Sequence, residues 1–287
     1  MRDYSSISPS AKGLLLMKGL TDIPFVADAA KIILGRPSST ALGKDKMDET
    51  FLKRLIHFEA RYKSVDNLLE NLGGNNILEM SSGFSFRGLQ MAINNPNVTY
   101  IDTDLPGVIE TKNELIDQLV SEQSLNLQGE LLVMPLNVLD EESFINTVAK
   151  LPAGPVNIVN EGLLMYLDTA EKIRLCRIIR KILSERGGYW ITADIYIKRD
   201  YAISKNDGFS QFLEAHKIEE KKFDSFEQAE SFFAEQGLKL FKKADPVFKQ
   251  LSSLKYIPQH ALEELAVQAR KIGSIRESWA LVVSGQL

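Results

Sequence analysis

The clearest periodic pattern of apolar positions lies in residues 47–72. The apolar residues there recur at alternating steps of four and three, which puts them on one face of a helix: Phe51, Leu55, Phe58, Tyr62, Val65, Leu69 and Leu72. Gly73 and Gly74 follow directly, as expected where a helix ends. A second amphipathic helix is predicted over 169–184, with Asp168 or Thr169 as its N-cap. Both patterns predict helices that pack one face against a core.

From residue 76 onwards, short apolar runs alternate with helical patterns. The predicted strands cover residues 76–80, 98–102, 131–135, 156–160, 189–195, 238–244 and 278–285. The predicted helices between them cover residues 86–94, 107–120, 141–149 and 169–184, with a later one near 259–271. Such alternation is typical of βαβ units and a mostly parallel sheet. We therefore predict an α/β fold with a doubly wound, seven-stranded sheet whose last strand is antiparallel.

The remaining segments surround this core. Residues 8–34 predict two short helices, and residues 35–45, rich in Gly, Pro, Ser and Thr, predict a loop. Charged helical patterns interrupt the alternation after residue 195. We predict one domain over residues 1–287, made of a helical N-terminal cap (1–72), a ligand-binding core (75–195), a lid insertion (196–236) and the C-terminal part of the sheet (237–287).

The composition of the chain limits the class of protein and the partners that we expect. The chain of 287 residues is 44% hydrophobic and 25% charged, which is ordinary for a globular protein. A net charge of −4 gives no general attraction to nucleic acid or to an anionic membrane. Cys176 is the single cysteine and the three histidines are far apart, so we expect no disulfide and no metal site. With no signal peptide and no long apolar run, we expect a cytoplasmic protein without nucleic-acid or membrane partners.

Ligands of a doubly wound sheet bind outside the carboxyl ends of the strands, so the residues that end each strand are candidates. Glu79, Ser81 and Gly83 stand where the first strand meets the next helix. Gly83 allows a ligand to approach the backbone, and the helix offers free N–H groups. An ordinary structural turn is an equal alternative, because Gly83 is the single glycine in the tight part of this turn.

Polar residues also follow the next three strands. Asp102 and Asp104 share one side of the second strand and lie about 20 residues after the turn, where a carboxylate can bind both ribose hydroxyls. A helix cap or a solvated carboxylate is the alternative. Asn137 could read an adenine edge and Val138 could pack on its face. Glu161 ends a buried strand, where a carboxylate needs a partner, so a ligand or a basic residue is expected nearby.

One arginine borders the apolar stripe of the first helix. Arg61 lies three residues after Phe58 and four before Val65. It is either an arginine that extends to solvent along an apolar surface or a bidentate partner for a ligand carboxylate. Lys12 and Lys18 are weaker candidates of the same kind.

Together these segments resemble a known enzyme family. "ARYKSVDNLL", "NILEMSSGFSFRG", "YIDTDLPGVIETK", "LNVLD" and "NEGLLMYL" resemble, in order and spacing, the leucine carboxyl methyltransferase family and its bacterial relatives, polyketide-type O-methyltransferases. The resemblance spans roughly residues 50–195, and residues 196–275 hardly match. It implies the class I methyltransferase fold and S-adenosylmethionine as cofactor, with S-adenosylhomocysteine as product.

The resemblance also implies roles for individual residues. Arg61 would hold the methionine carboxylate and Asp104 the ribose hydroxyls, and Glu161 would lie near the methionine amino group. The residues expected to bind the cofactor are Arg61, Glu79, Ser81, Gly83, Arg87, Asp102, Asp104, Leu105, Asn137, Val138, Glu161 and Gly162. By the same resemblance, Glu161 and Tyr166 are expected near the reaction. The family usually has glycine at the position of Ser81 and aspartate at that of Ser85, and Ser81 adds a side chain where the ligand should come close.

The expected activity is O-methylation of a carboxylate or a hydroxyl on a small molecule. A carboxylate acceptor needs no base, whereas a hydroxyl acceptor benefits from one. His216 is the histidine proposed for that role, against the alternative of a surface residue. Aromatic residues of the insertion could line an acceptor pocket or form a plain core: Phe209, Phe212, Phe223, Phe232 and Phe233. Two other functions stay open, namely protein carboxyl methylation and cofactor binding without transfer.

Overall fold

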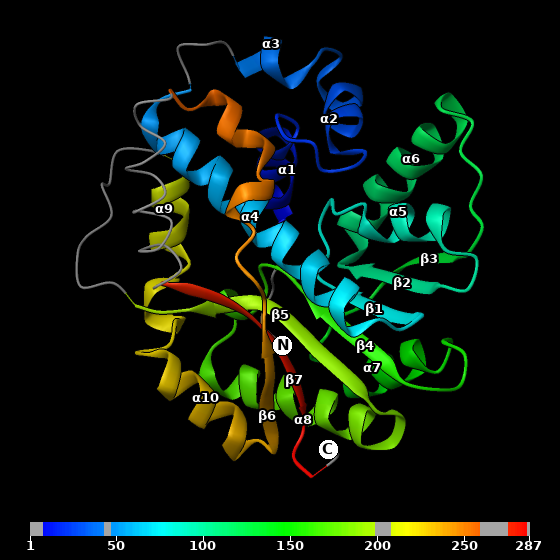
Figure 1. Cartoon of the computed structure of the whole chain (residues 1–287), viewed down its shortest axis with the longest axis vertical. Helices are drawn as coiled ribbons and strands as arrows, with labels where there is room; N and C mark the ends of the chain where they lie inside the picture. Colours follow the sequence, from blue (N-terminus) through cyan, green and yellow to red (C-terminus); the bar gives the residue numbers. More distant parts are fainter. Residues whose placement is uncertain (1–7, 43–46, 199–207, 259–274, 286–287) are drawn as a thin grey trace.

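The computed structural model describes residues 8–42, 47–198, 208–258 and 275–285. Their centre is a seven-stranded sheet (Figure 1). Its strands are β1 (Asn76–Met80), β2 (Thr99–Asp104), β3 (Glu130–Pro135), β4 (Val156–Asn160), β5 (Gly188–Tyr196), β6 (Leu238–Lys243) and β7 (Arg276–Val283). Every predicted strand is therefore present, and no end is shifted by more than two residues.

The strand order in the sheet is β3-β2-β1-β4-β5-β7-β6. Strands β1 to β5 run parallel to one another, and β7 runs antiparallel to both β5 and β6. The doubly wound α/β sheet with an antiparallel last strand is thus confirmed, and it is the class I methyltransferase fold. The order reverses between β1 and β4, which is where a sheet of this kind binds its ligand.

Helices connect and cover the strands. The α-helices are α1 (Ser8–Lys18), α2 (Val26–Leu34), α3 (Ser38–Leu42), α4 (Glu49–Leu72), α5 (Arg87–Asn94), α6 (Pro106–Glu122), α7 (Glu141–Val148), α8 (Thr169–Arg186), α9 (Gly208–Ala215) and α10 (Phe226–Glu235). Short 3₁₀ helices are η3 (Leu164–Tyr166), η4 (Glu219–Lys221), η5 (Phe248–Gln250) and η6 (Ser252–Tyr256). The loop prediction for 35–45 is wrong in part, because α3 forms within it. The helix predicted near 259–271 lies outside the described residues.

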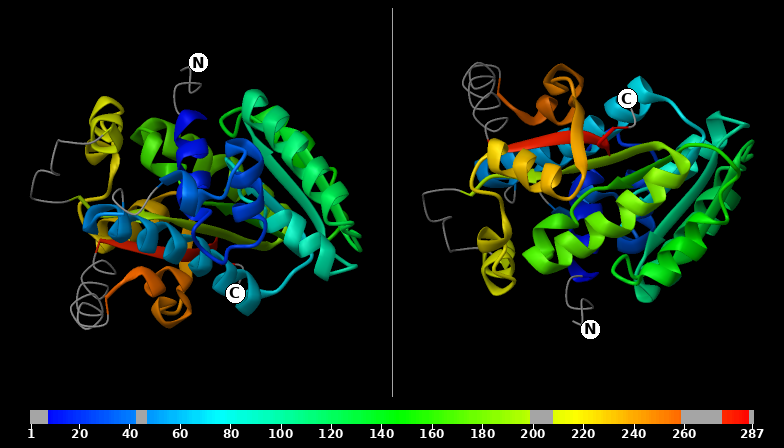
Figure 2. Two further views of the ribbon diagram at one scale, coloured as in Figure 1. Left: turned by 90° about the horizontal axis from the view of Figure 1, so that it is seen from above. Right: turned by 90° about the horizontal axis from the view of Figure 1, so that it is seen from below.

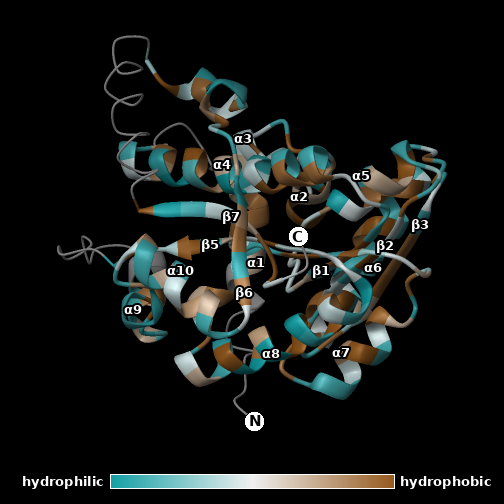
Figure 3. Ribbon diagram, turned by 60° about the horizontal axis from the view of Figure 1, so that its bottom comes forward, coloured by the Kyte–Doolittle hydropathy of each residue, from teal (hydrophilic) through white to brown (hydrophobic). Residues whose placement is uncertain are grey.

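Two layers of helices enclose the sheet, as the two views of Figure 2 show. Alternate residues along a strand face opposite layers, so Ile77 packs in the cluster with Val65 of α4, and Leu78 packs in the cluster with Leu175 of α8. Helices α4, α5 and α6 cover one face, and α7, α8 and α10 cover the other. Along the helices, hydrophobic and hydrophilic stretches alternate (Figure 3), as expected for helices with one buried face.

The helices predicted over 47–72 and 169–184, which are α4 and α8, begin and end close to the predicted residues. Asp48 caps α4 by accepting a hydrogen bond from the Phe51 N–H. At α8 the cap is Asp168 rather than Thr169, because the Asp168 side chain and Glu171 form a reciprocal capping box. Among the described helices, none is long and apolar enough to cross a bilayer.

Candidate functional site

A cavity opens at the carboxyl ends of β1, β2 and β4, at the reversal of strand order. Counted out to its open mouth, it encloses about 1270 Å³ of empty space. Most of the residues predicted to bind a ligand line it: Arg61, Ser81, Gly83, Asp104, Leu105, Asn137, Val138, Glu161, Gly162 and Tyr166. Residues of α1 and α9 complete the wall, so the N-terminal cap and the insertion both reach the site.

The turn of residues 81–83 is fastened to the end of β2. The Gly83 N–H donates to Asp104 Oδ2 at 2.7 Å, and the Ser82 N–H donates to the Thr103 carbonyl at 3.0 Å. The Leu105 N–H donates to Asp104 Oδ1, also at 2.7 Å. Burial raises the pKa of Asp104, and the two backbone hydrogen bonds oppose that rise. Each carboxylate oxygen keeps acceptor capacity toward the cavity.

Ser81 adopts a backbone conformation that suits glycine. Its φ is +49°, in the left-handed region, and that of Gly83 is +54°. Glycine takes such angles freely, whereas a residue with a side chain is strained there. The serine at the position where glycine is expected has therefore kept the backbone path of a glycine turn, and it adds its side chain to the cavity wall.

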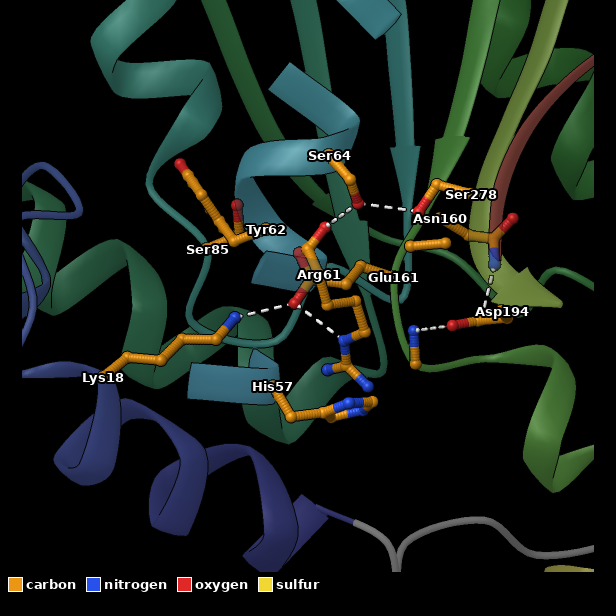
Figure 4. A network of polar contacts seen from close by, with 12 residues as sticks. Lys18, His57, Arg61, Tyr62, Ser64, Ser85, Asn160, Glu161, Asp194 and Ser278 are labelled. Carbon is orange, nitrogen blue, oxygen red and sulfur yellow. Dashed lines mark hydrogen bonds and ion pairs between the residues drawn. The ribbon is translucent and has the colours of Figure 1, made fainter. Parts of the chain in front are cut away.

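Glu161 is the centre of a cluster of three cations, shown in part in Figure 4. Its Oε1 lies 2.7 Å from Lys18 Nζ and 3.1 Å from Arg61 Nε, and its Oε2 lies 3.4 Å from Arg87 Nη2. Burial alone would raise the pKa of Glu161, but the three cations outweigh burial and hold that pKa well below its usual range. Burial lowers the pKa of Lys18, while Glu161 opposes that change. A carboxylate held charged so firmly is a poor proton acceptor.

Arg87 and Glu79 support the wall from behind instead of forming part of it. In addition to Glu161, the Arg87 guanidinium forms ion pairs with Glu79 and with Asp66, whose Oδ1 lies 2.6 Å from Arg87 Nε. Glu79 is fully buried and also accepts hydrogen bonds from Tyr100 at 2.6 Å and Ser85 at 3.3 Å. The expected aspartate at position 85 is thus replaced by a donor to Glu79. In the described part of the chain, Glu79 and Arg87 lie outside the pocket wall, so the expectation of direct ligand contact is not met for them.

Asp102 likewise lies beneath the wall. It is on the same side of β2 as Asp104, as predicted, but it is two residues deeper in the strand, where Lys112 of α6 and Ser82 cover it. Sequence alternation gives the side of a strand and not the depth at which a side chain is covered.

On the opposite side of the cavity, Tyr166 and Leu213 of α9 contribute to the wall. The His216 ring lies 6.4 Å from the Tyr166 ring and 4.2 Å from the Phe212 ring, and its Nδ1 lies 2.9 Å from the Phe212 carbonyl oxygen. His216 therefore packs next to a wall residue without belonging to the wall that the described residues form.

The phenylalanines of the insertion divide between two roles. The core prediction holds for three of them, since they are buried in the core beside α8: Phe223, Phe232 and Phe233. Phe212 packs against Tyr166 at the site. The side chain of Phe209 lies outside the described residues.

Two further features shape the segment after Glu161. Gly162 has a φ of +84°, which favours glycine, and a Cβ there would lie 3.2 Å from Arg61 Nη2, so the guanidinium would have to shift. Asp194 of β5 accepts hydrogen bonds from the N–H groups of Gly162, Leu163 and Leu164, at 2.7, 2.6 and 3.0 Å. This carboxylate shapes the segment after Glu161 (Figure 4), yet it sits inside a strand and was not a candidate.

No protein-family model and no curated protein matches the sequence. Solved structures with a similar fold include LepI in complex with S-adenosylmethionine (12% identity, 77% of this chain and 46% of that chain, TM-score 0.44). The mitomycin 7-O-methyltransferase MmcR is 10% identical over 89% of this chain and 63% of that chain, with a TM-score of 0.48. The O-methyltransferase NcsB1 was crystallised with S-adenosylhomocysteine and 1,4-dihydroxy-2-naphthoic acid. It is 13% identical over 88% of this chain and 63% of that chain, with a TM-score of 0.44. This chain spans less than two thirds of the length of each.

Proposed function

We propose that the cavity binds S-adenosylmethionine and that the protein transfers its methyl group to an oxygen atom of a small molecule. The observation that carries the proposal is that Gly83, Asp104, Asn137 and Glu161 follow four neighbouring strands and line one cavity. The cofactor has an amino-acid part, a ribose and a base, and these positions offer a partner to each. The sequence resemblance to the leucine carboxyl methyltransferase family supports the same assignment.

The charges of the site fit the amino-acid part of the cofactor. That part carries a carboxylate and an ammonium group. Lys18 and Arg61 would hold the carboxylate and Glu161 the ammonium, so the zwitterion would enter an existing set of ion pairs without changing its net charge. Asp104 would accept hydrogen bonds from the ribose hydroxyls.

Gly83 brings its backbone to the cavity wall. Its φ of +54° favours glycine over a residue with a side chain, and a Cβ there would lie 3.4 Å from Ala11 of α1. Asn137 and Val138 line the same cavity after β3, and we assign them to the adenine.

When bound, S-adenosylmethionine supplies an electrophilic methyl group on a sulfonium sulfur. The protein aligns an acceptor oxygen with that methyl group and excludes water. Leu14, Met165 and Leu213 make much of the remaining wall apolar, so we assign a small, largely apolar acceptor to that space. Tyr166 lies on the same side and would orient the acceptor oxygen.

The acceptor oxygen belongs to a carboxylate or to a hydroxyl. A carboxylate needs no proton acceptor, and Glu161 is too firmly ion-paired to serve as one. His216, beside Tyr166, is the proposed proton acceptor for a hydroxyl. His216→Asn should therefore slow methylation of phenols and leave methylation of carboxylic acids unchanged.

Calorimetry with S-adenosylhomocysteine and S-adenosylmethionine tests the cofactor assignment. We expect binding to the wild type and, for Asp104→Asn, a dissociation constant raised about tenfold. Asp117→Asn, an exposed aspartate on α6, is the matched control and should bind like the wild type. Absence of binding at millimolar ligand would overturn the proposal.

Transfer is tested with methyl-labelled S-adenosylmethionine and three acceptor sets: apolar carboxylic acids, phenols, and peptides with a free C-terminus. Label in the first two sets supports the proposal, and label in the peptides alone favours protein carboxyl methylation. Tight cofactor binding with no labelled product favours a binding protein without transfer activity.

A further inference from the structure

A second polar cluster lies beneath the 81–83 turn, and the proposed chemistry does not use it. Lys112 of α6 is fully buried, and its Nζ lies 2.5 Å from Asp102 Oδ2 and donates to Ser82 Oγ at 2.9 Å. Ser82 Oγ in turn donates to Asp102 Oδ1. Three elements (β2, α6 and the turn) thus meet in one set of two hydrogen bonds and an ion pair, and of its three residues only Ser82 belongs to the cavity wall.

Burying an ammonium and a carboxylate is costly even when they pair. An apolar pair of similar size often stabilises a protein as well as a buried ion pair does, so stability alone is weak grounds for this pair. Burial raises the pKa of Asp102 to about 6, although the Lys112 ammonium opposes the rise. The pair does fix the orientation of the Ser82 side chain, because Lys112 donates to the Ser82 hydroxyl and Asp102 accepts from it.

Ser82 stands between the two residues of the turn with left-handed backbone angles. Ser81 has the strained one, since it carries a side chain at a φ of +49°. Ser82 is held at its N–H by Thr103 and at its hydroxyl by Asp102 and Lys112. With Ser82 held at both groups, Ser81 stays in the glycine-like conformation and the Gly83 N–H stays directed at Asp104.

We propose that Lys112 is a positioning residue for the cofactor turn: through Ser82 it holds the turn in the shape that a glycine would adopt unaided. Lys112 does not reach the cavity wall itself. The inference rests on the proposed function, because its effect on a ligand is read from cofactor binding at Asp104 and Gly83.

The test uses the full chain and S-adenosylhomocysteine as the calorimetric probe. Lys112→Met with Asp102→Asn removes both buried charges together and should raise the dissociation constant about tenfold. Adding Ser81→Gly to this double variant should restore the affinity to that of Ser81→Gly alone, because glycine adopts the left-handed angle without support. A merely structural role for Lys112 would not be rescued by a change at Ser81.

Lys172→Met is the matched control. Lys172 is another buried lysine, on α8, and its ammonium donates to the Lys221 carbonyl instead of the turn. This variant should keep the affinity of the wild type. If the double variant does not fold, Asp102→Asn alone preserves the shape of the side chain and is measured in the same way.

Hydrogen exchange gives a readout that needs no ligand. The Ser82 and Gly83 amides should exchange faster in the double variant than in the wild type, and should be unchanged in Lys172→Met. Faster exchange in a protein that binds no cofactor would support the inference about the turn and overturn the proposed function. The inference would be overturned if exchange or affinity were unchanged in the double variant, or if Ser81→Gly did not restore the affinity. Binding of the cofactor by the wild type would in that case still support the proposed function.

Discussion

Lys18 Nζ lies 2.7 Å from Glu161 Oε1, although the two residues are 143 positions apart in the chain. This ion pair ties α1 to the carboxyl end of β4. Residues of α1 also line the cavity, so the helix covers the site while its last residue binds the central carboxylate.

Glu161→Gln should destabilise the protein by about 3 kcal/mol, because the buried Arg61 and Arg87 and the partly buried Lys18 lose their shared carboxylate. Urea unfolding measures the change. Glu141→Gln is the control: its pair with Lys181 has a similar length of 3.0 Å but is exposed, so the change should stay within about 0.5 kcal/mol. Equal effects of the two substitutions would contradict the role given to the cluster.

The stabilisation from Glu161 should also follow pH in a defined way. Its folded pKa is depressed below the ordinary value of 4.5, so its contribution is present above that value and is lost as the pH falls through the folded pKa. The difference between wild type and Glu161→Gln should thus be equal at pH 7 and pH 5.5, and should shrink below about pH 4. A difference that already shrinks between pH 7 and 5.5 would refute the assignment.

Lys18→Met should weaken binding of S-adenosylhomocysteine about tenfold, since one of the two cations assigned to its carboxylate is removed. Lys12→Met provides the comparison. Lys12 lies on the same helix but is exposed, so its loss should leave the affinity unchanged. Calorimetry on both variants separates a local contact from the general charge of α1, and equal losses would favour the general charge.

Gly162→Ala should cost about 2 kcal/mol in unfolding free energy and should also weaken cofactor binding. The added methyl group would strain a φ of +84° and press on Arg61 Nη2 at 3.2 Å. In Gly107→Ala, at the start of α6, a Cβ would meet no atom within 4 Å, and the change should be neutral or slightly stabilising. A harmless Gly162→Ala would show that the Arg61 position tolerates displacement.

Lys172 predicts a stability change in the alkaline range. Burial, together with Lys221, lowers its pKa from 10.5 to about 8. Between these values the folded state has released the proton while the unfolded chain keeps it, so stability rises with pH. The wild type should therefore gain stability relative to Lys172→Met between pH 7 and 9.5. Lys150→Met, at an exposed lysine, is measured in the same denaturation experiment as the control for the loss of one positive charge.

The sheet and the floor of the site could be predicted from the sequence because both follow from local patterns. Apolar runs mark the strands, and the carboxyl ends of parallel strands meet at one edge. Gly83, Asp104 and Glu161 could therefore be assigned to one site before any coordinates were known. Where the pattern is weaker, as over residues 35–45, a short helix formed within a predicted loop.

The partners of these residues could not be predicted in the same way. Lys18 meets Glu161, and Asp194 holds the segment after it, across sequence separations that carry no periodic signal. Asp102 was placed on the correct side of β2, but its cover by Lys112 depends on how close α6 packs. Long-range contacts and depth of burial are set by tertiary packing, which a single sequence does not display.

The position of β7 between β5 and β6 has a consequence for the synthesis of the protein. β6 pairs with β7 alone in the sheet, so it cannot join the sheet until β7, which comes later in the chain, has been synthesised. Until then β5 presents an open edge with Trp190 and Ile191 on its two faces. An uncovered apolar edge invites pairing with other chains. The nascent chain accordingly exposes this edge from the making of β5 until the arrival of β7, and a chaperone that covers it would prevent such pairing.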